Sequence, residues 1–560
     1  MRALRHTACA GTLVLGACAM PGLQIDLAAT APKLAGYGNA GFTITTGSAA
    51  AQAQFNQGVQ QAYAFNEAEA VRMFKAALAA DPGCAMCAWG VAWQLGPNIN
   101  APDRGDLAQA LRYADLAQRR AAGATPREQA LIDAVALRYG QGAGTPLPAP
   151  MLADVCASPG SKAAHPLDLA YADRLHSLVQ RWPGDADLLS LWAEAEMVAT
   201  RSDWWRDDGT PAGRIGELAD RLATALTTQP EHTGLNHYLI HAADAPPAAQ
   251  RAVAAADRLG RLAPASPHLQ HMPSHIYVRM GRYADATRVN QQAMDSEQRL
   301  FDAQKSQGFT ISKDWRNHDQ QFLWFAALME GRGDIALEAA RDLASRSAGD
   351  HPYAEYRRSL PLLALLRLER WDALLAEALP SGNKGMAQAL GEGARGVAYV
   401  RKGRLPEATA SLARAEAGAA AIAKSHPKPK GFDRLLRDVG SAAVLRLRAE
   451  IATTAGRHDE ALQLQAQAVT ASKNADDNEP PMLAAGARLA LGELQLRAGQ
   501  AAAAEATFRA DLAAQPGSGW ALSGLGRALT AQGRAEQAGA LQASLKQVWP
   551  VADAELLARR

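Results

Sequence analysis

Two short segments of this chain are rich in histidine, a residue that can bind a metal or transfer a proton: HTGLNHYLIH (232–241) and HLQHMPSHIY (268–277). Together with a third segment they contain seven of the thirteen histidines: His232, His237, His241, His268, His271, His275 and His318. Imidazole is the commonest metal ligand in proteins and a frequent acid or base. We therefore expect any chemistry of this protein in this part of the chain.

The spacing of these histidines fits helices. His237 and His241 are four residues apart, so both face the same side of a helix. Separations of three and four residues place the histidines of the second segment on one stripe, on a helix that is kinked or begins near Pro273. A sequence typical of a turn follows each of the histidine segments, as expected for the first helix of a helical hairpin. We expect three consecutive first helices of helical hairpins, about 8–10 Å apart, to carry the histidines on one concave wall.

Several interpretations of this cluster stay open. Imidazole pairs four residues apart suit Zn or Cu when a third ligand comes from elsewhere. Candidate oxygen ligands or bases are Glu231, Asp244 and Asp319. Alternatively, the histidines bridge helices through hydrogen bonds to polar neighbours, or they bind a non-metal ligand or act as acid and base. No closed metal motif such as H-E-x-x-H decides among these roles.

Five further residues are candidates for binding a ligand or lining a groove: Asn236, Tyr238, Tyr277, Trp204 and Trp205. Asn236, Tyr238 and Tyr277 lie among the histidines and could also be their hydrogen-bond partners. The two tryptophans open the segment WWRDDG (204–209). This segment either edges a binding groove or packs in the core or in a loop.

Cys84 and Cys87 form a C-x-x-C pattern at the expected start of a helix, where the helix N-terminus lowers a thiol pKa. A local disulfide or inert buried thiols compete here with a redox or metal-binding role. Cys156 makes the number of cysteines beyond the N-terminal leader odd. At least one thiol is then unpaired unless it bonds to another chain or binds a ligand.

The N-terminal residues are typical of a secretory signal. Arg2 and Arg5 precede an apolar run that ends in Leu-Gly-Ala-Cys18, which resembles a bacterial lipobox. Lipidation of Cys18 would anchor the mature chain to a membrane on the periplasmic side, whereas ordinary cleavage near this point is the alternative. We expect a signal segment over 1–18 and a flexible tether over 19–50. No later stretch approaches the roughly 20 apolar residues of a membrane span.

Composition indicates a helical array rather than one compact core. The chain has 560 residues, 6% aromatic and 20% charged, with a net charge of only +2. A chain of this length exceeds one compact core, and its Ala and Leu content favours helix. The small net charge and the absence of a long basic stripe argue against nucleic-acid binding.

Spacings of 34 residues near the C-terminus predict the repeat. Gly492 and Gly526 are separated by this number, and so are Gly499 and Gly533. This period is typical of tetratricopeptide hairpins, so we predict an all-α fold of the tetratricopeptide α–α superhelix type. The expected regions are N-terminal helical repeats (51–145), an inserted loop (146–166), central repeats with the histidines (167–350) and C-terminal tetratricopeptide repeats (351–560).

The chain resembles a family of exported bacterial tetratricopeptide-repeat proteins of mostly unassigned function. The matching pieces are DPGCAMCAWG (81–90), GPNIN (96–100), HTGLNHYLIH (232–241), HMPSHIY (271–277) and the tryptophan of WALSGLG (520–526). The resemblance implies the fold and export, but no reaction. Two departures stand out: Cys87 replaces a small residue, and Gln321 stands where the family pattern has a further histidine after His318.

These observations predict an exported α-solenoid that binds a protein, a peptide or a small ligand. The alternative is a metal-binding protein or a metal-dependent enzyme, with Zn or Cu held by His237, His241, His271 and His275. Contact with a membrane is expected through the lipid anchor only, and no nucleic-acid partner is expected.

Overall fold

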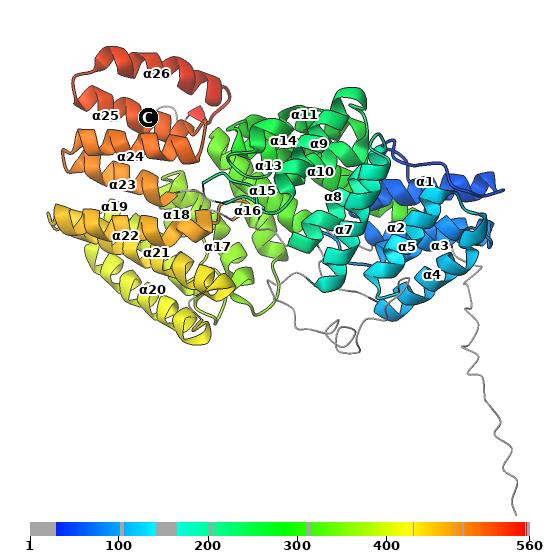
Figure 1. Ribbon diagram of the computed structural model, residues 1–560. Helices are drawn as coiled ribbons and strands as arrows, with labels where there is room; N and C mark the ends of the chain where they lie inside the picture. The colour runs from blue at the N-terminus through cyan, green and yellow to red at the C-terminus, as the bar shows by residue number, and fades with distance from the viewer. Residues whose placement is uncertain are drawn as a thin grey trace, which may run out of the picture.

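The computed structural model describes residues 30–100, 106–141, 165–200, 204–206, 208–310, 315–428, 430–476, 478–483, 486–554 and 556. Within these ranges the chain is helical and has no strand, apart from one isolated bridge between Trp205 and Pro211. Figure 1 shows a series of paired helices from the blue N-terminal region to the red C-terminal hairpin. The prediction of an all-α superhelix is confirmed. The signal segment, Cys18, Cys156 and most of the expected loop at 146–166 lie outside the described residues.

The N-terminal part contains eight α-helices within the described residues, and neighbours along the chain pack together. Its helices are α1 (Ala49–Tyr63), α2 (Glu67–Ala80), α3 (Ala85–Gln94), α4 (Leu107–Arg120), α5 (Pro126–Arg138), α7 (Pro166–Arg181), α8 (Ala186–Thr200) and α9 (Ile215–Thr228). Side-chain caps explain several starts. Thr125 and Glu128 form a capping box at the beginning of α5, and Pro126 occupies the first turn, where a missing N–H costs nothing.

The central part carries the histidines. Its helices are α10 (Thr233–Ala242), α11 (Val253–Leu262), α12 (Pro267–His271), α13 (Pro273–Arg279), α14 (Tyr283–Ser306), α15 (Arg316–Glu330) and α16 (Gly333–Arg346). Pro273 separates α12 from α13, as the sequence predicts, because proline lacks the N–H that would continue the earlier helix.

The C-terminal part contains the most regular hairpins. Its helices are α17 (Pro352–Arg367), α18 (Trp371–Ala376), α19 (Met386–Arg401), α20 (Leu405–Ser425), α21 (Gly431–Thr454), α22 (His458–Asp476), α23 (Gly486–Arg497), α24 (Ala501–Ala514), α25 (Gly519–Ala531) and α26 (Ala535–Val548). The first helices of these hairpins contact one another in succession. Gly499 and Gly533 adopt φ angles of 74° and 75° in the turns, a region that favours glycine. None of the described helices is long and apolar enough to cross a membrane.

The two glycines that define the 34-residue period play different roles. A Cβ atom on Gly492 would lie 2.6 Å from the ring of Phe508, so this glycine lets α23 approach α24 closely. A Cβ atom on Gly526 would meet no atom within 4 Å. Close packing in the last hairpin instead involves Gly524, whose Cβ would lie 2.4 Å from the same phenylalanine ring.

The array closes on itself. Nε1 of Trp520 in α25 donates to the carbonyl of Leu328 in α15 at 2.9 Å. Nε1 of Trp549, just after α26, donates to the carbonyl of Met329 at 2.8 Å. Both bonds join residues about two hundred positions apart in the sequence, so the last hairpin packs against the helix that carries His318.

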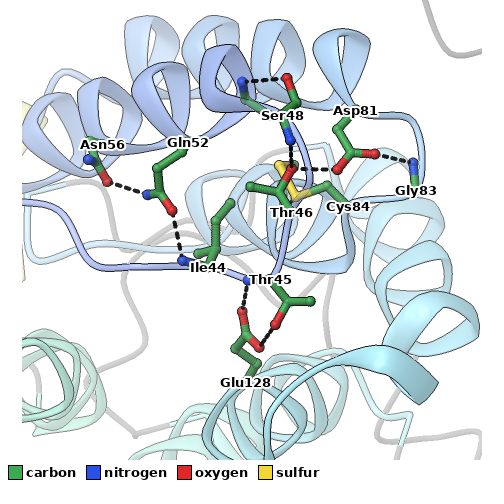
Figure 2. The surroundings of a disulfide bond; sticks show 12 residues. Ile44, Thr45, Thr46, Ser48, Gln52, Asn56, Asp81, Gly83, Cys84 and Glu128 are labelled. Atoms are coloured by element: carbon green, nitrogen blue, oxygen red, sulfur yellow. Dashed lines mark hydrogen bonds between the residues drawn. A yellow bond between two sulfur atoms is a disulfide. The ribbon is translucent and has the colours of Figure 1, made fainter.

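The segment before α1 differs from the predicted flexible tether over 19–50. Its described residues, from residue 30 onward, lie against the helices, with Tyr37 and Ile44 buried. The backbone N–H and the hydroxyl of Thr45 both donate to the carboxylate of Glu128 at 2.6 Å, and Thr46 donates to Asp81 (Figure 2). Buried apolar side chains and these hydrogen bonds make the segment part of the packed structure.

Candidate metal centre

Three histidines from α10 and α12 form a first triad, His237, His241 and His268. Nε2 of His237 lies 3.1 Å from Nε2 of His241 and 3.1 Å from Nε2 of His268. All three side chains are buried. Residues that are 31 positions apart in the sequence thus present the same ring atom to one point.

A second triad, His271, His275 and His318, comes from α12, α13 and α15. Nε2 of His271 lies 3.0 Å from Nε2 of His275. One nitrogen from each ring lies within 4.8 Å of the others. The predicted convergence of three consecutive first helices is therefore present, but as two groups rather than one.

Oxygen atoms behind the second triad fix the orientation of two rings. Nδ1 of His275 lies 2.7 Å from Oδ2 of Asp244, and Nδ1 of His271 lies 2.6 Å from Oδ1 of Asn290. Because these oxygens only accept hydrogen bonds, each Nδ1 is assigned as the protonated nitrogen. Outer partners of this kind are typical of metal-ligating histidines.

In the neutral form of His275 this assignment leaves two Nε2 lone pairs facing each other across 3.0 Å in the second triad, whereas in its protonated form Nε2 of His275 donates to Nε2 of His271. Two lone pairs at that distance repel unless a proton or a metal cation lies between them. When zinc binds nitrogen at about 2.0–2.1 Å in a tetrahedral site, neighbouring ligand nitrogens are roughly 3.3 Å apart. The Nε2 separations in both triads come close to that dimension.

The two triads are neighbours. His268 belongs to the first and His271 to the second, yet they lie one turn apart on α12, where Cβ atoms are about 5–6 Å apart. Electrostatics links the groups as well, because the charge of His275 lowers the pKa of His237 and of His241. Each triad by itself groups three nitrogens that could hold a cation.

Burial keeps most of these imidazoles neutral. Loss of solvent lowers the pKa of His241 and of His318 to about 3, and it lowers the pKa of His237 and His271 well below the usual value. Burial also acts to lower the pKa of His275, but Asp244 and Glu479 outweigh it and raise that pKa to about 10. Neutral imidazole is the form that binds metals, so His275 must release a proton when a metal binds to the second triad.

A phenylalanine covers each triad. The ring centroid of Phe65, in the turn between α1 and α2, lies 4.6 Å, 5.3 Å and 5.0 Å from those of His237, His241 and His268. Phe65 adopts a φ of 52°, a left-handed conformation that costs a bulky residue of the order of 1–3 kcal/mol. Phe322 lies 4.5–5.1 Å from the three rings of the second triad. The turn before α2 is thus held in a strained form where it closes the first triad.

A pocket reaches the second triad from outside. His275, Asp244, Arg279 and Phe322 line it together with residues 478–481 and 513–516. Its volume is about 110 Å³. Arg279 bonds to Asp244 at 3.1 Å and to Glu479 at 2.7 Å, so a segment distant in sequence closes one side of the pocket. A small molecule could reach the second triad by this route.

Of the remaining predicted metal ligands, His232 and Glu231 lie outside both triads, whereas Asp319 lies next to the second triad. His232 stands apart from both triads: it caps α10 through Leu235 and contacts Asp187. Glu231 is exposed. Asp319 is buried behind the second triad, with a carboxylate oxygen 3.3 Å from Nδ1 of His271, so it can orient that ring rather than face the centre.

The predicted groove residues serve the scaffold. Asn236 is buried and donates to the carbonyls of Pro230 and His232. Tyr238 stacks on His237 within the core. The Tyr277 hydroxyl donates to Asp257, and Nε1 of Trp205 donates to the carbonyl of Ala242. Trp204 is partly buried and packs against the core. Tyr277 also lines a surface pocket beside Asp257 and Gln270, so its role in a groove stays a prediction.

Gln321 and the C-x-x-C pattern were two further features of the sequence, and the structure shows what each of them contacts. Oε1 of Gln321 accepts from the Tyr353 hydroxyl at 3.1 Å, and both triads are complete without a histidine at that position. Cys84 and Cys87 form a disulfide, drawn in Figure 2, whose two residues are buried. Of the alternatives for this C-x-x-C pattern, the local disulfide is the one present.

Sequence reasoning missed four residues of the centre: Phe65, Phe322, Asn290 and Glu479. One of them carried a usable signal, because Phe322 follows His318 by four residues and so shares its helix face. The other three come from α14, from the α1–α2 turn and from the segment before α23. No local spacing connects those positions to the histidines.

Fold and site together define a helical-repeat protein with a histidine-rich centre. No protein-family model and no curated protein matches the chain. Among solved structures it is similar to the APC/C hetero-tetramer Cut9–Hcn1, with 12% identity, 91% of this chain and 76% of that chain covered, and a TM-score of 0.26. It is also similar to the TPR domain of P58(IPK), with 12% identity, 87% and 99% covered, and a TM-score of 0.22.

A further similar structure is Naa15/Naa10 bound to HypK-THB, with 13% identity, 89% of this chain and 70% of that chain covered, and a TM-score of 0.22. These TM-scores are too low to carry an argument about function or partners. The fold class rests instead on the chain's own helices and on their order.

Proposed function

We propose that this protein binds two transition-metal ions, one at each histidine triad. The observation that carries the proposal is the convergence of three ring nitrogens in each triad, within 4.8 Å of one another. In the second triad, oxygens hold Nδ1 of His271 and of His275 and fix the two rings. The first triad repeats the same convergence of Nε2 atoms at 3.1 Å.

The donor set favours Zn or Cu. Imidazole nitrogen suits Zn, Cu, Fe and Ni, and the described triads offer no thiolate that would select a softer metal. Three protein ligands leave a coordination position open, which is the arrangement of catalytic rather than structural zinc sites. Two ions in adjacent triads would suit a metal-dependent enzyme in which a small molecule binds between them. The pocket beside His275 supports such access.

Metal content of the purified chain tests the proposal. Protein stripped with a chelator and then dialysed against Zn²⁺ or Cu²⁺ is expected to retain two ions per chain. The double variant His237→Ala/His271→Ala is expected to retain none while circular dichroism shows unchanged helix content. His232→Ala is the matched control, because His232 lies at the start of α10 outside both triads.

The outcomes separate the alternatives. Two bound ions in the wild type and in the His232 variant, with loss in the double variant, would support the proposal. A wild type that takes up neither ion at neutral pH would overturn it. Uptake that survives the double substitution would overturn the assignment of the ions to the triads.

Export and anchoring belong to the same proposal. The charged and apolar N-terminal residues and the Leu-Gly-Ala-Cys18 run support a lipoprotein that faces the periplasm. In that setting the helical array would act both as the support for the metal centre and as a binding scaffold for a further ligand.

A further inference from the structure

The surface pocket that Tyr277 lines is a polar groove between α11 and α14, with α12 and α13 as its floor. The helices α11, α13 and α14 are neighbours in the green part of Figure 1. The volume of the groove is about 420 Å³, within the roughly 300–1,000 Å³ of small-molecule sites. Gln270, Pro273 and Tyr277 line its floor, and none of these three belongs to a triad. The groove is therefore separate from the candidate metal centre.

Positive charge predominates along the groove. The charged residues that line it are Arg261 on α11, Arg288 and Arg299 on α14, and Asp257 on α11. Asp257 is already engaged, because it accepts hydrogen bonds from the Tyr277 hydroxyl at 3.0 Å and from Arg282 at 2.8 Å. Three guanidinium groups thus line the groove together with one carboxylate whose partners are in place.

The end of the groove near the start of α14 is electrically balanced. Arg282 pairs with Asp257 and with Asp285, at 2.8 Å each, and Arg288 pairs with Asp285 at 2.9 Å. Two arginines and two aspartates therefore compensate one another there. The surplus of positive charge lies toward the other end.

At that other end, Arg261 and Arg299 have no carboxylate partner within the part of the chain that the structure describes. Arg299 donates to the hydroxyl of Ser296 at 2.8 Å. Asp295 and Asp302 lie within about one turn of Arg299 on α14, but neither pairs with it and neither lines the groove. This end of the groove therefore carries two guanidinium groups that no carboxylate binds.

Ser296 shows that the two arginines stand at the same end. Its hydroxyl donates to the carbonyl of Pro264 at 3.1 Å and accepts the hydrogen bond from Nη2 of Arg299. Pro264 follows Arg261 by three residues, just after the end of α11. The guanidinium group of Arg299 thus lies beside the turn that follows Arg261, although the two residues belong to different hairpins.

We propose that this groove binds the phosphate monoester of a small polyhydroxylated molecule, a sugar phosphate. A phosphate monoester carries a charge of roughly −1.5 to −2 at neutral pH, which matches two guanidinium groups. Planar guanidinium groups donate to phosphate oxygens through strong charge-assisted hydrogen bonds. The phosphate would pair with Arg261 and Arg299, and the sugar hydroxyls would bind the amides of Gln270 and Gln292, which line the groove.

Isothermal titration calorimetry on the full chain, kept metal-free with a chelator, tests the site with glucose 6-phosphate as the probe. Glucose 6-phosphate is expected to bind, whereas glucose, which lacks the phosphate, is expected to bind at least about tenfold more weakly. Added salt should weaken the binding of glucose 6-phosphate, because both arginines are exposed. No binding of glucose 6-phosphate, or equal binding of the two sugars, would overturn the proposal.

The variants Arg261→Met and Arg299→Met each remove one guanidinium group from the groove. Each is expected to lose at least about tenfold in affinity for glucose 6-phosphate. Both side chains are exposed, so the melting temperature should change little. Arg251→Met is the matched control, because Arg251 is exposed, lies ten residues before Arg261 and pairs with Asp220 outside the groove. An equal loss in this control would show an effect of net charge alone and would contradict the site.

Two further outcomes would overturn the proposal. The first is wild-type affinity for glucose 6-phosphate in both folded arginine variants. The second is tighter binding of dihexanoyl phosphatidic acid, a soluble lipid with the same phosphate, than of glucose 6-phosphate, which would assign the groove to a lipid headgroup. Neither outcome bears on the metal proposal, since the triads are intact in every variant and the measurements use no metal.

Discussion

Asp244 orients His275 through a hydrogen bond of 2.7 Å, although the two residues belong to different hairpins. Asp244 follows the end of α10 by two residues, and α10 carries His237 and His241 of the first triad. One helix therefore supplies ligand candidates to the first triad and an orienting carboxylate to the second. Arg279 bonds to the other oxygen of Asp244 and keeps the carboxylate in place.

Asp244→Asn is expected to weaken metal binding at the second triad by about 10–100-fold, the usual effect of losing a carboxylate behind a ligating histidine. The first triad should keep its affinity. Competition with a chromophoric chelator measures both sites. Asp187→Asn is the control, because Asp187 contacts His232 outside the triads. Equal weakening of both sites would contradict this division of roles.

The equivalent glycines of the last two hairpins should respond in opposite directions to alanine. Gly492→Ala places a methyl group 2.6 Å from the ring of Phe508 and should lower the free energy of unfolding by about 1–3 kcal/mol. Gly526→Ala meets no neighbouring atom within 4 Å and should raise it by up to about 1 kcal/mol through helix propensity. Urea unfolding of both variants gives the comparison. A similar loss in both would refute the packing difference.

Glu194 makes stability depend on pH. Burial raises the pKa of its carboxyl from 4.5 to about 7, partly opposed by Arg138 and by a hydrogen bond from Trp93. The folded chain therefore keeps a proton that the unfolded chain releases above pH 4.5. The resulting stabilisation is present below that value and is lost as pH rises through about 7, a loss of roughly 3 kcal/mol.

Glu194→Gln should remove this loss while it keeps an acceptor for Trp93. The free energy of unfolding of the variant should fall less than that of the wild type between pH 5 and pH 8, as measured by urea unfolding at each pH. Parallel pH profiles for the two proteins would show that Glu194 titrates normally in the folded chain.

The N-terminal cysteine gives a prediction about location. If Cys18 is lipidated, Cys18→Ala should release the mature chain into the soluble periplasmic fraction. Fractionation followed by immunoblotting detects the change. Membrane association that persists in the variant would contradict the lipoprotein proposal.

The sequence predicts local features of this protein well. Spacings of three and four residues place the histidines on the correct helix faces, and Pro273 marks the boundary between α12 and α13. The 34-residue period of Gly499 and Gly533 corresponds to left-handed turns. These features depend on neighbours within a few residues, so a single sequence contains them.

Long-range contacts explain what the sequence could not predict. The division of six histidines into two triads depends on how α10, α12, α13 and α15 rotate against one another. Phe65 and Glu479 reach the site from positions more than 150 residues away from it. The segment before α1 looks like a linker in composition, yet Thr45 and Glu128 tie it to α5. Such contacts leave no periodic pattern in the amino-acid sequence.

The contact between α25 and α15 limits how many hairpins the chain can have between these two helices. In an open repeat protein each unit touches only its neighbours, so hairpins can be gained or lost at an end. Here the bonds from Trp520 to Leu328 and from Trp549 to Met329 join the last hairpin to the middle of the chain. An added or deleted hairpin between these points would shift one partner away from the other. The number of hairpins between α15 and α25 is therefore constrained by geometry, and this part of the chain should unfold as a unit rather than fray from its C-terminal end.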